Sequence, residues 1–343
     1  MKKIGLAGLP NAGKSSIFKL LTKKDVLIAN YSFSTIKPNT ECFTFFDGRI
    51  NKIKSFFKKP IVKHAELKIT DIPGIVKNAS KNIGMGNRFI SQMRECDLII
   101  IVLKFFNIIE EDLNLETEYD SFNDFETIKT EFVISDLEQV DKKIEKNNNL
   151  LTKEKGINYN IIKKENAILE KIKENLINFK FISEIEMNNN DREMLKKYDF
   201  LTNKPYFVIA NFSNNSKKNL EIFKSKVKSE IVELNVKEEI KKIEKEERIF
   251  ENEKFFNKIK DKLNLKVFFT AGEKEVKSWI INNNASAKEC AGLIHSDIKE
   301  RLIRVSLLNE DKCNELKDLI KNREKEKKDY IIKDGEICEF IFN

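Results

Sequence analysis

Residues 8–15 carry the residue types that bind the phosphates of a nucleotide. The stretch Gly8-Leu9-Pro10-Asn11-Ala12-Gly13-Lys14-Ser15 is a full match to the phosphate loop G-x-x-x-x-G-K-[ST]. In such a loop the backbone N–H groups face phosphate oxygens, the lysine reaches the β- and γ-phosphates and the hydroxyl binds Mg²⁺. The stretch predicts a nucleoside triphosphate site whose binding residues are Asn11, Ala12, Gly13, Lys14, Ser15 and Ser16.

Two further segments complete the predicted chemistry. Asp71 follows the apolar stretch Leu67–Thr70 and opens a D-x-x-G motif that ends at Gly74. The carboxylate can hold a water on Mg²⁺, and the glycine N–H can approach a γ-phosphate. Thr35 lies between the two motifs, where a hydroxyl can bind Mg²⁺ only while the γ-phosphate is present. We therefore expect a nucleotide-dependent switch, with Lys14, Thr35, Asp71 and Gly74 as catalytic residues and Ser15 and Thr35 as Mg²⁺ ligands.

These residues need a parallel sheet to position them. Residues 1–130 alternate strand and helix patterns, which is typical of a parallel α/β sheet with crossover helices. The amphipathic pattern of Ser16–Leu21 predicts a helix directly after the loop, and Pro205–Asn211 returns to a buried strand. The expected strands of the first part are Lys3–Ala7, Glu41–Phe46, Glu66–Thr70 and Leu98–Leu103.

A helical segment interrupts this sheet between about Asp124 and Asp199. Its apolar residues recur at helical spacing: Ile134, Leu137, Val140 and Ile144, then Ile161, Ile168, Ile172 and Leu176. Two antiparallel helices joined between Asn147 and Gly156 would form a helical hairpin or short coiled coil. A passive insertion that packs on the sheet and a dedicated contact arm both stay open.

A third unit follows a Lys/Glu-rich run, residues 237–262, that predicts a solvated helix and connector. We expect a strand at Lys266–Thr270, a helix at Ala285–Lys299 and closing strands within Asp329–Phe342 around the turn Lys333–Glu336. The predicted domains are therefore 1–123 with 200–262, the inserted 124–199, and 263–343.

The composition limits the setting of the protein. The chain has 343 residues, a net charge of +8 and five scattered cysteines without a C-x-x-C pair, which favours a reducing, cytoplasmic location. The longest apolar run, Leu98–Leu103, is too short to cross a membrane. The positive charge fits an anionic partner such as RNA, although a lysine-rich solvated surface would have the same composition.

Several segments in the same order resemble the YchF/Obg-like ATPase family. They are residues 8–11, 29–40, 71–81, 84–89, 268–272 and 328–335. The resemblance implies an Obg-type P-loop domain with an inserted helical hairpin, followed by a β-grasp TGS domain. It also implies a hydrolase that prefers ATP over GTP, binds the large subunit of the ribosome and its rRNA, and acts around translation or stress. Neither a membrane nor DNA is an expected partner.

The chain departs from common nucleotide hydrolases at the catalytic and base positions. Ile75 stands where many such enzymes have a catalytic Gln, so we expect slow hydrolysis. The base motif is Asn211-Phe212-Ser213-Asn214, without the carboxylate that reads guanine. We expect Asn211 and Phe212 to contact the base. A weakly hydrolysing interaction module and a GTPase remain alternatives.

Three other residues bear on the cofactors and the proton chemistry. The family often has a His after the strand that ends near Phe106, and this chain has none there. Its two histidines, His64 and His295, are expected to be structural or exposed. Asn11 lies where some P-loop hydrolases help to hold K⁺, which leaves a potassium requirement open by analogy.

Overall fold

The computed structural model describes residues 1–24, 39–72, 85–106, 109–110, 115–116, 120–153, 155–213, 217–246, 248–312 and 323–343. The chain divides into two compact units. The larger unit comprises residues 2–41 and 68–246. The smaller unit comprises Met1, residues 42–67 and residues 247–343. The domain boundaries expected from the sequence stay predictions, whereas the contacts group residues 42–67 with the C-terminal part.

The main sheet of the larger unit holds the predicted nucleotide site. Among the described residues its strand order is β2-β4-β1-β5-β8-β9. Strand β1 pairs in parallel with β4 and β5, and β8 pairs in parallel with β5 and β9. The strands are β1 (Lys3–Ala7), β2 (Asn39–Phe45), β4 (Ala65–Asp71), β5 (Leu98–Phe105), β8 (Tyr206–Phe212) and β9 (Ile231–Leu234). All five predicted strands of this part are confirmed, with ends shifted by at most a few residues. Every residue of β5 is buried, as expected of a central parallel strand.

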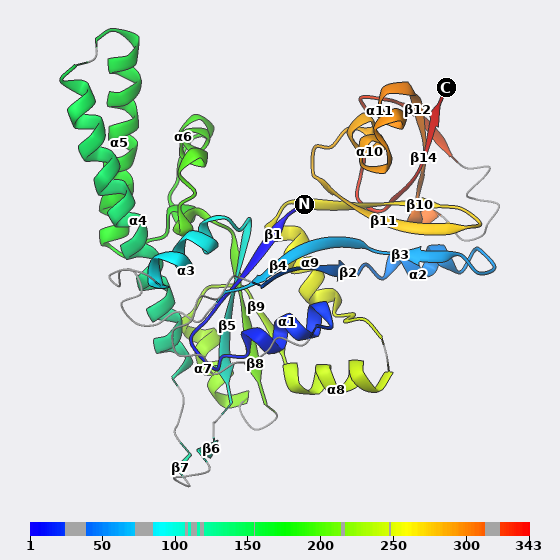
Figure 1. Cartoon of the computed structure of the whole chain (residues 1–343), viewed down its shortest axis with the longest axis horizontal. Helices are drawn as coiled ribbons and strands as arrows, with labels where there is room; N and C mark the ends of the chain where they lie inside the picture. Colours follow the sequence, from blue (N-terminus) through cyan, green and yellow to red (C-terminus); the bar gives the residue numbers. More distant parts are fainter. Residues whose placement is uncertain are drawn as a thin grey trace. The chain divides into compact units, whose positions relative to one another are not determined.

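Helices accompany this sheet on both sides of its strands in the sequence (Figure 1). They are α1 (Lys14–Thr22), α3 (Met85–Arg94), α4 (Ser121–Leu151), α5 (Ile157–Ile177), α6 (Asn189–Leu195), α7 (Lys217–Lys226) and α8 (Val236–Glu246). Short 3₁₀ turns η1 (Ile182–Glu184), η2 (Lys196–Tyr198) and η3 (Leu201–Asn203) lead back to β8, and β6 (Ile109–Glu110) pairs with β7 (Leu115–Glu116). No helix in the described ranges is long and apolar enough to cross a membrane.

Helices α4 and α5 form the predicted helical hairpin (Figure 1). The Asp120 carboxylate starts α4 because it accepts the free N–H groups of Phe122 and Asn123, each at 3.0 Å. The later positions of the predicted apolar faces, from Val140 onward in α4 and from Ile168 onward in α5, are buried.

One predicted apolar position of the hairpin is wrong. The Ile161 side chain is 53% exposed. It lies in the first turns of α5, where α4 has almost ended and offers few neighbours to pack against. Its apolar spacing therefore does not correspond to burial.

The smaller unit combines two distant parts of the sequence in one sheet. The strand order is β13-β12-β14-β10-β11-β3 in the described residues. The strands are β3 (Ile61–Lys63), β10 (Leu265–Ala271), β11 (Glu275–Asn282), β12 (Leu302–Asn309), β13 (Glu324–Lys327) and β14 (Glu336–Phe342). The helices are α2 (Arg49–Lys54), α9 (Glu253–Lys262), α10 (Ala287–Ile294) and α11 (Ser296–Arg301), with a 3₁₀ turn η4 (Glu310–Lys312). Strand β3, which the sequence did not suggest, pairs in parallel with β11.

The predicted helix at Ala285–Lys299 is wrong in that it is two helices. Helix α10 begins with a capping box between Ser286 and Glu289 and ends at Ile294. His295 is extended (φ −161°, ψ 143°) and its Nδ1 accepts the N–H of Asp297 at 3.2 Å, which starts α11. A side chain that caps a new helix explains why the helical pattern continues across the break.

The predicted closing hairpin is also wrong in its pairing. Strand β14 pairs antiparallel with β12 and parallel with β10. In the segment before the turn, Ile331 forms only an isolated bridge with Ser286. The turn itself is confirmed, since Gly335 has a positive φ of 87° and its N–H donates to the carbonyl of Val267 at 2.8 Å.

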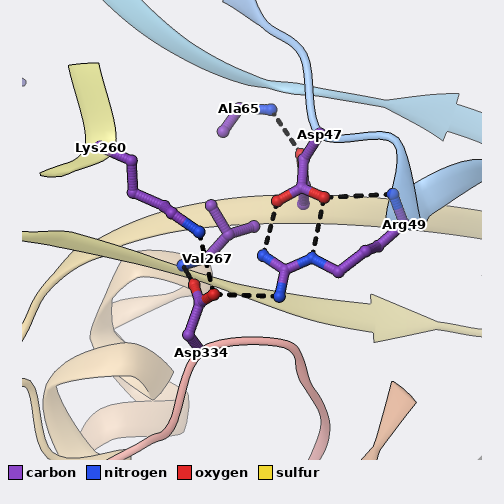
Figure 2. Close-up of polar contacts among 7 residues, drawn as sticks. Asp47, Arg49, Ala65, Lys260, Val267 and Asp334 are labelled. Carbon is purple, nitrogen blue, oxygen red and sulfur yellow. Dashed lines mark hydrogen bonds and ion pairs between the residues drawn. The ribbon is translucent and has the colours of Figure 1, made fainter. Parts of the chain in front are cut away.

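An ionic cluster joins residues 47–49 to the C-terminal part of the smaller unit (Figure 2). We call Asp47, Arg49, Lys260 and Asp334 the Arg49 cluster. Arg49 donates two side-chain hydrogen bonds to Asp47, at 2.9 and 2.7 Å, and a third to Asp334 at 3.0 Å. Asp334 also accepts from Lys260 at 3.0 Å and from the backbone of Val267 at 2.8 Å. Every charge of the cluster therefore faces an opposite charge within the cluster.

Candidate nucleotide-binding site

The phosphate loop lies between the end of β1 and the start of α1. Strand β1 ends at Ala7, and α1 begins at Lys14. Gly13 is the N-cap of α1 and has a left-handed backbone (φ 99°, ψ 19°), and Asn11 also has a positive φ of 61°. These two reversals turn the chain sharply before the helix, so that the N-terminus of α1 follows directly on the loop.

Asn211, at the end of the nearby strand β8, supports the loop. Its buried Nδ2 donates to the carbonyl of Ala12 at 3.1 Å. A Cβ atom at Gly13 would lie 2.3 Å from this nitrogen, and one at Gly8 would lie 2.7 Å from the carbonyl oxygen of Val102. Glycine at both positions lets the loop backbone come this close. Asn211, expected at the base, is thus placed against the phosphate loop.

Lys14 lies folded over the loop with its charge held at the phosphate position. Its Nζ donates to the carbonyls of Gly8 and Leu9, each at 3.1 Å, and the side chain is only 7% exposed. Burial lowers the pKa of Lys14 to about 8, against the opposing charge of Asp71. Within the described ranges Lys14 makes no ion pair, so carbonyl dipoles alone hold the ammonium. A bound phosphate would supply the full negative charge that the site lacks.

Ser15 and Asp71 meet beside Lys14. The parallel register places Asp71, the last residue of β4, opposite Leu6 of β1. The Ser15 hydroxyl donates to a carboxylate oxygen of Asp71 at 2.9 Å. Burial raises the pKa of Asp71, and the hydrogen bond from Ser15 and the charge of Lys14 only partly oppose this rise. We call Lys14, Ser15 and Asp71 the phosphate site.

The donor atoms of the phosphate site fit Mg²⁺. A hydroxyl and a carboxylate are hard oxygen donors, and Mg²⁺ is bound in such sites by one or two protein oxygens together with phosphates and waters. The raised pKa of Asp71 shows that its negative charge lacks full compensation. A divalent cation at this position would supply that compensation.

Other predicted site residues have different surroundings. Asn11 is exposed, Ala12 is buried and Ser16 is half-buried in the first turn of α1. Phe212 is half-buried and packs, like Leu9, against the apolar core of the larger unit. Thr35, Gly74, Ile75 and Asn214 lie outside the described residues.

The two histidines have structural surroundings. His64 is half-buried, with its ring 6.1 Å from the ring of Phe46, and burial lowers its pKa. His295 caps α11 as described above. Both lie in the smaller unit, and neither contacts a residue of the phosphate site.

A buried ion pair that the sequence did not suggest fixes the base of the helical hairpin. Arg94 ends α3, the helix that follows the D-x-x-G segment, and its Nη1 lies 2.8 Å from Asp136 of α4. Asp136 is fully buried and also accepts the backbone N–H and the hydroxyl of Thr202, each at 2.8 Å. The available signal was an acidic residue four positions from both Phe132 and Val140, in a buried stripe of α4. A carboxylate at such a position requires a partner.

Two family models match the chain. A model described as "50S ribosome-binding GTPase" matches residues 3–152. The C-terminal model of YchF GTPases, described as "Protein of unknown function (DUF933)", matches residues 265–343.

Full-length relatives are similar along the whole chain. The ribosome-binding ATPase YchF of Mycoplasma genitalium is 31% identical, with 100% of both chains covered. The protein of the same name from Bacillus subtilis is 32% identical, with 99% of this chain and 98% of the relative covered. The solved structure of the Schizosaccharomyces pombe YchF GTPase is 26% identical and has a TM-score of 0.81, covering 99% of this chain and 97% of that one.

Proposed function

The chain belongs to the YchF family, and from this membership we propose that it is an ATP-binding and ATP-hydrolysing switch protein that associates with the ribosome. The observation that carries the proposal is the phosphate site at the end of a parallel sheet. There a buried lysine has no anionic partner within the described ranges, and a serine hydroxyl lies 2.9 Å from a carboxylate. This arrangement is suited to a triphosphate with a divalent cation.

The side chains of the phosphate site divide the work of binding the triphosphate. Lys14 places its positive charge on the β- and γ-phosphate oxygens, and the Ser15 hydroxyl holds Mg²⁺. Asp71 orients a water on that ion, while Thr35 and Gly74 respond to the γ-phosphate. When bound, Mg²⁺ neutralises negative charge on the phosphates. Asn11 makes K⁺ a second cation to test.

The position after the D-x-x-G segment sets the expected rate. Ile75 has no polar atom with which to orient the attacking water. Intrinsic turnover should therefore be slow, and a ribosome-supplied group would raise it. Because ribosomes work in the cytoplasm, the protein should be located there.

The base preference rests on the end of β8. Asn211 spends its Nδ2 on the loop carbonyl of Ala12, and the sequence offers Asn214 where a guanine-reading carboxylate would stand. A carboxylate-free pocket cannot accept the two N–H groups of guanine as well as a carboxylate does. We therefore propose that ATP binds at least as tightly as GTP.

Calorimetry with non-hydrolysable ATP and GTP analogues in Mg²⁺ tests the base preference. A tenfold preference for GTP, about 1.4 kcal/mol, would contradict the adenine assignment. Steady-state phosphate release with and without ribosomes, in Na⁺ and in K⁺, tests the hydrolysis. Stimulation by ribosomes is the expected result, and Lys14→Ala is the control for contaminating ATPases.

Cosedimentation tests the ribosome as partner. The whole chain should pellet with ribosomes at low salt, and added salt should release it, because phosphate contacts displace counterions. If it stays in the supernatant at low salt, with and without ATP, ribosome association is wrong.

A further inference from the structure

The far end of the helical hairpin differs in charge from its base. We call residues 142–164, where α4 ends and α5 begins, the hairpin tip. The tip contains seven lysines and two glutamates, a net charge of +5. The remaining hairpin, residues 121–141 and 165–177, contains nine acidic and three basic residues, a net charge of −6. The arm is thus strongly polarised along its length (Figure 1).

The lysines of the tip are available to a partner. Lys146, Lys153, Lys155 and Lys163 are exposed, and no ion pair holds them within the described part of the chain. Lysines nearer the base are engaged instead, as Lys173 is with Asp141 at 2.8 Å. An array of unpaired cations at the end of an arm costs self-repulsion that a polyanion would relieve.

Apolar and amide side chains accompany these lysines. Ile157 is 79% exposed, Ile161 is 53% exposed and Tyr159 is 37% exposed, all on the first turns of α5. The exposed asparagines of the tip include Asn148 and Asn160. An aromatic ring and amides among lysines are the residue types that contact bases and sugars beside a phosphate backbone. A surface meant only for solubility has no use for exposed isoleucines.

We propose that the hairpin tip binds an RNA backbone exposed on the ribosome. The proposal rests on the proposed ribosome association and names the part of the chain that makes the contact. The +5 charge supplies the attraction, and the acidic base keeps the lower part of the arm away from the RNA. Tyr159 and the neighbouring isoleucines pack against bases or sugars there.

A charge-removal variant tests this contact. Lys146→Ala/Lys153→Ala/Lys155→Ala/Lys163→Ala removes four positive charges from the tip. The matched control, Lys58→Ala/Lys59→Ala/Lys180→Ala/Lys254→Ala, removes four exposed and unpaired lysines elsewhere in the described ranges. Both should keep the parent's circular dichroism and basal phosphate release, since none of these residues contacts the phosphate site.

Ribosome binding is then measured over a range of salt concentrations. Each lost phosphate contact lowers the slope of log K against log salt by roughly 0.7–0.9. The tip variant should lose about 2 to 3 units of slope and at least tenfold in affinity at low salt, whereas the control should stay close to the parent. Tyr159→Ala should weaken binding by about tenfold with the slope unchanged, because stacking carries no charge.

The outcomes separate the two proposals. If the parent binds ribosomes and the tip variant binds with the same affinity and slope, the tip inference is wrong while ribosome association stands. If the parent does not bind at all, both are wrong. Purified ribosomal RNA identifies the partner: a tip-dependent interaction with whole ribosomes but not with this RNA would indicate an acidic ribosomal protein and overturn the RNA assignment.

Discussion

The phosphate site and the Arg49 cluster are both ionic, both largely withdrawn from water, and opposite in their electrostatics. In the phosphate site burial lowers the pKa of Lys14 to about 8 and raises that of Asp71. In the Arg49 cluster burial would also disfavour the charges, but the hydrogen bonds and charges of the partners reverse its effect. The pKa of Arg49 is raised and that of Asp334 is lowered.

The difference shows which cluster awaits a ligand. The Arg49 cluster pairs each charge with hydrogen-bonded partners, so it stabilises the protein without any addition. The phosphate site leaves both of its charges undercompensated, which costs stability in the free protein. A triphosphate and its metal ion would supply the missing charges. Perturbation without compensation therefore distinguishes a binding site from a structural ion cluster.

The largest expected effect is on Lys14. Lys14→Ala should reduce ATP turnover to background, because the loop then lacks the positive charge aimed at the β- and γ-phosphates. The nucleotide-free variant should unfold at the parent temperature or above it, since the buried ammonium is unfavourable there. Phosphate release and thermal melting without nucleotide measure the two effects. Turnover at the parent rate would show that the site is misplaced.

Asp71 should affect the chemistry more than the affinity. Asp71→Ala should lower hydrolysis by roughly 10- to 100-fold, because the carboxylate acts through the metal and its water. Nucleotide affinity should fall much less, since the Lys14 contacts remain. Thr35→Ala should behave in the same way. Single-turnover hydrolysis beside calorimetric binding separates the two quantities, and an equal loss in both would assign Asp71 to plain binding.

The phosphate site was predictable because its signals are local. The loop, its strand and its helix lie within residues 3–22, and the glycine pattern fixes the turn. The role of Asn211 was not predictable, because its contact with Ala12 joins residues 199 positions apart. Strand β3 escaped prediction for the same reason: three residues pair with β11 more than 200 positions later, and a strand so short carries no periodicity.

Patterns also failed where neighbours decide burial. Ile161 has the correct helical spacing, yet it lies where the partner helix has almost ended. Arg49 gives no pattern at all, since its partners Lys260 and Asp334 come from the other end of the chain. Such clusters depend on tertiary contacts that composition and spacing do not encode.

The Arg49 cluster should give the reverse of the Lys14 result. Arg49→Ala should lower the free energy of unfolding by about 2 kcal/mol, less than for a fully buried pair because Arg49 is partly exposed. Arg49→Lys should cost less but still lose the two-fold hydrogen bond to Asp47. Urea unfolding followed by the fluorescence of Trp279, the single tryptophan and part of the same unit, measures both.

A matched surface variant and an activity assay complete this test. Lys196→Ala removes an exposed ion pair with Glu193 and should change the free energy of unfolding by less than about 1 kcal/mol. Nucleotide binding by Arg49→Ala at a temperature where it is folded should match the parent. An unchanged urea midpoint would show that the cluster contributes no net stability, and the contrast with the phosphate site would fail.

The smallest expected effect is a pH dependence of nucleotide affinity. A pKa of about 8 means that Lys14 loses its proton in the free protein as the pH rises above 8. A bound triphosphate favours the ammonium, so binding above pH 8 must take up a proton. Affinity should therefore be independent of Lys14 titration below pH 8 and fall by up to tenfold per pH unit above it.

The same titration acts on stability with the opposite sign. Between pH 8 and the ordinary lysine pKa of 10.5, the unfolded chain keeps a proton that the free folded protein has lost. The stability contribution of Lys14 therefore rises with pH across this window while affinity falls. Calorimetry at pH 7.5, 8.5 and 9.5, in buffers of different ionisation enthalpy, counts the protons taken up. Lys14→Ala must lose the proton uptake above pH 8; if it keeps the parent's uptake, the titrating group lies elsewhere.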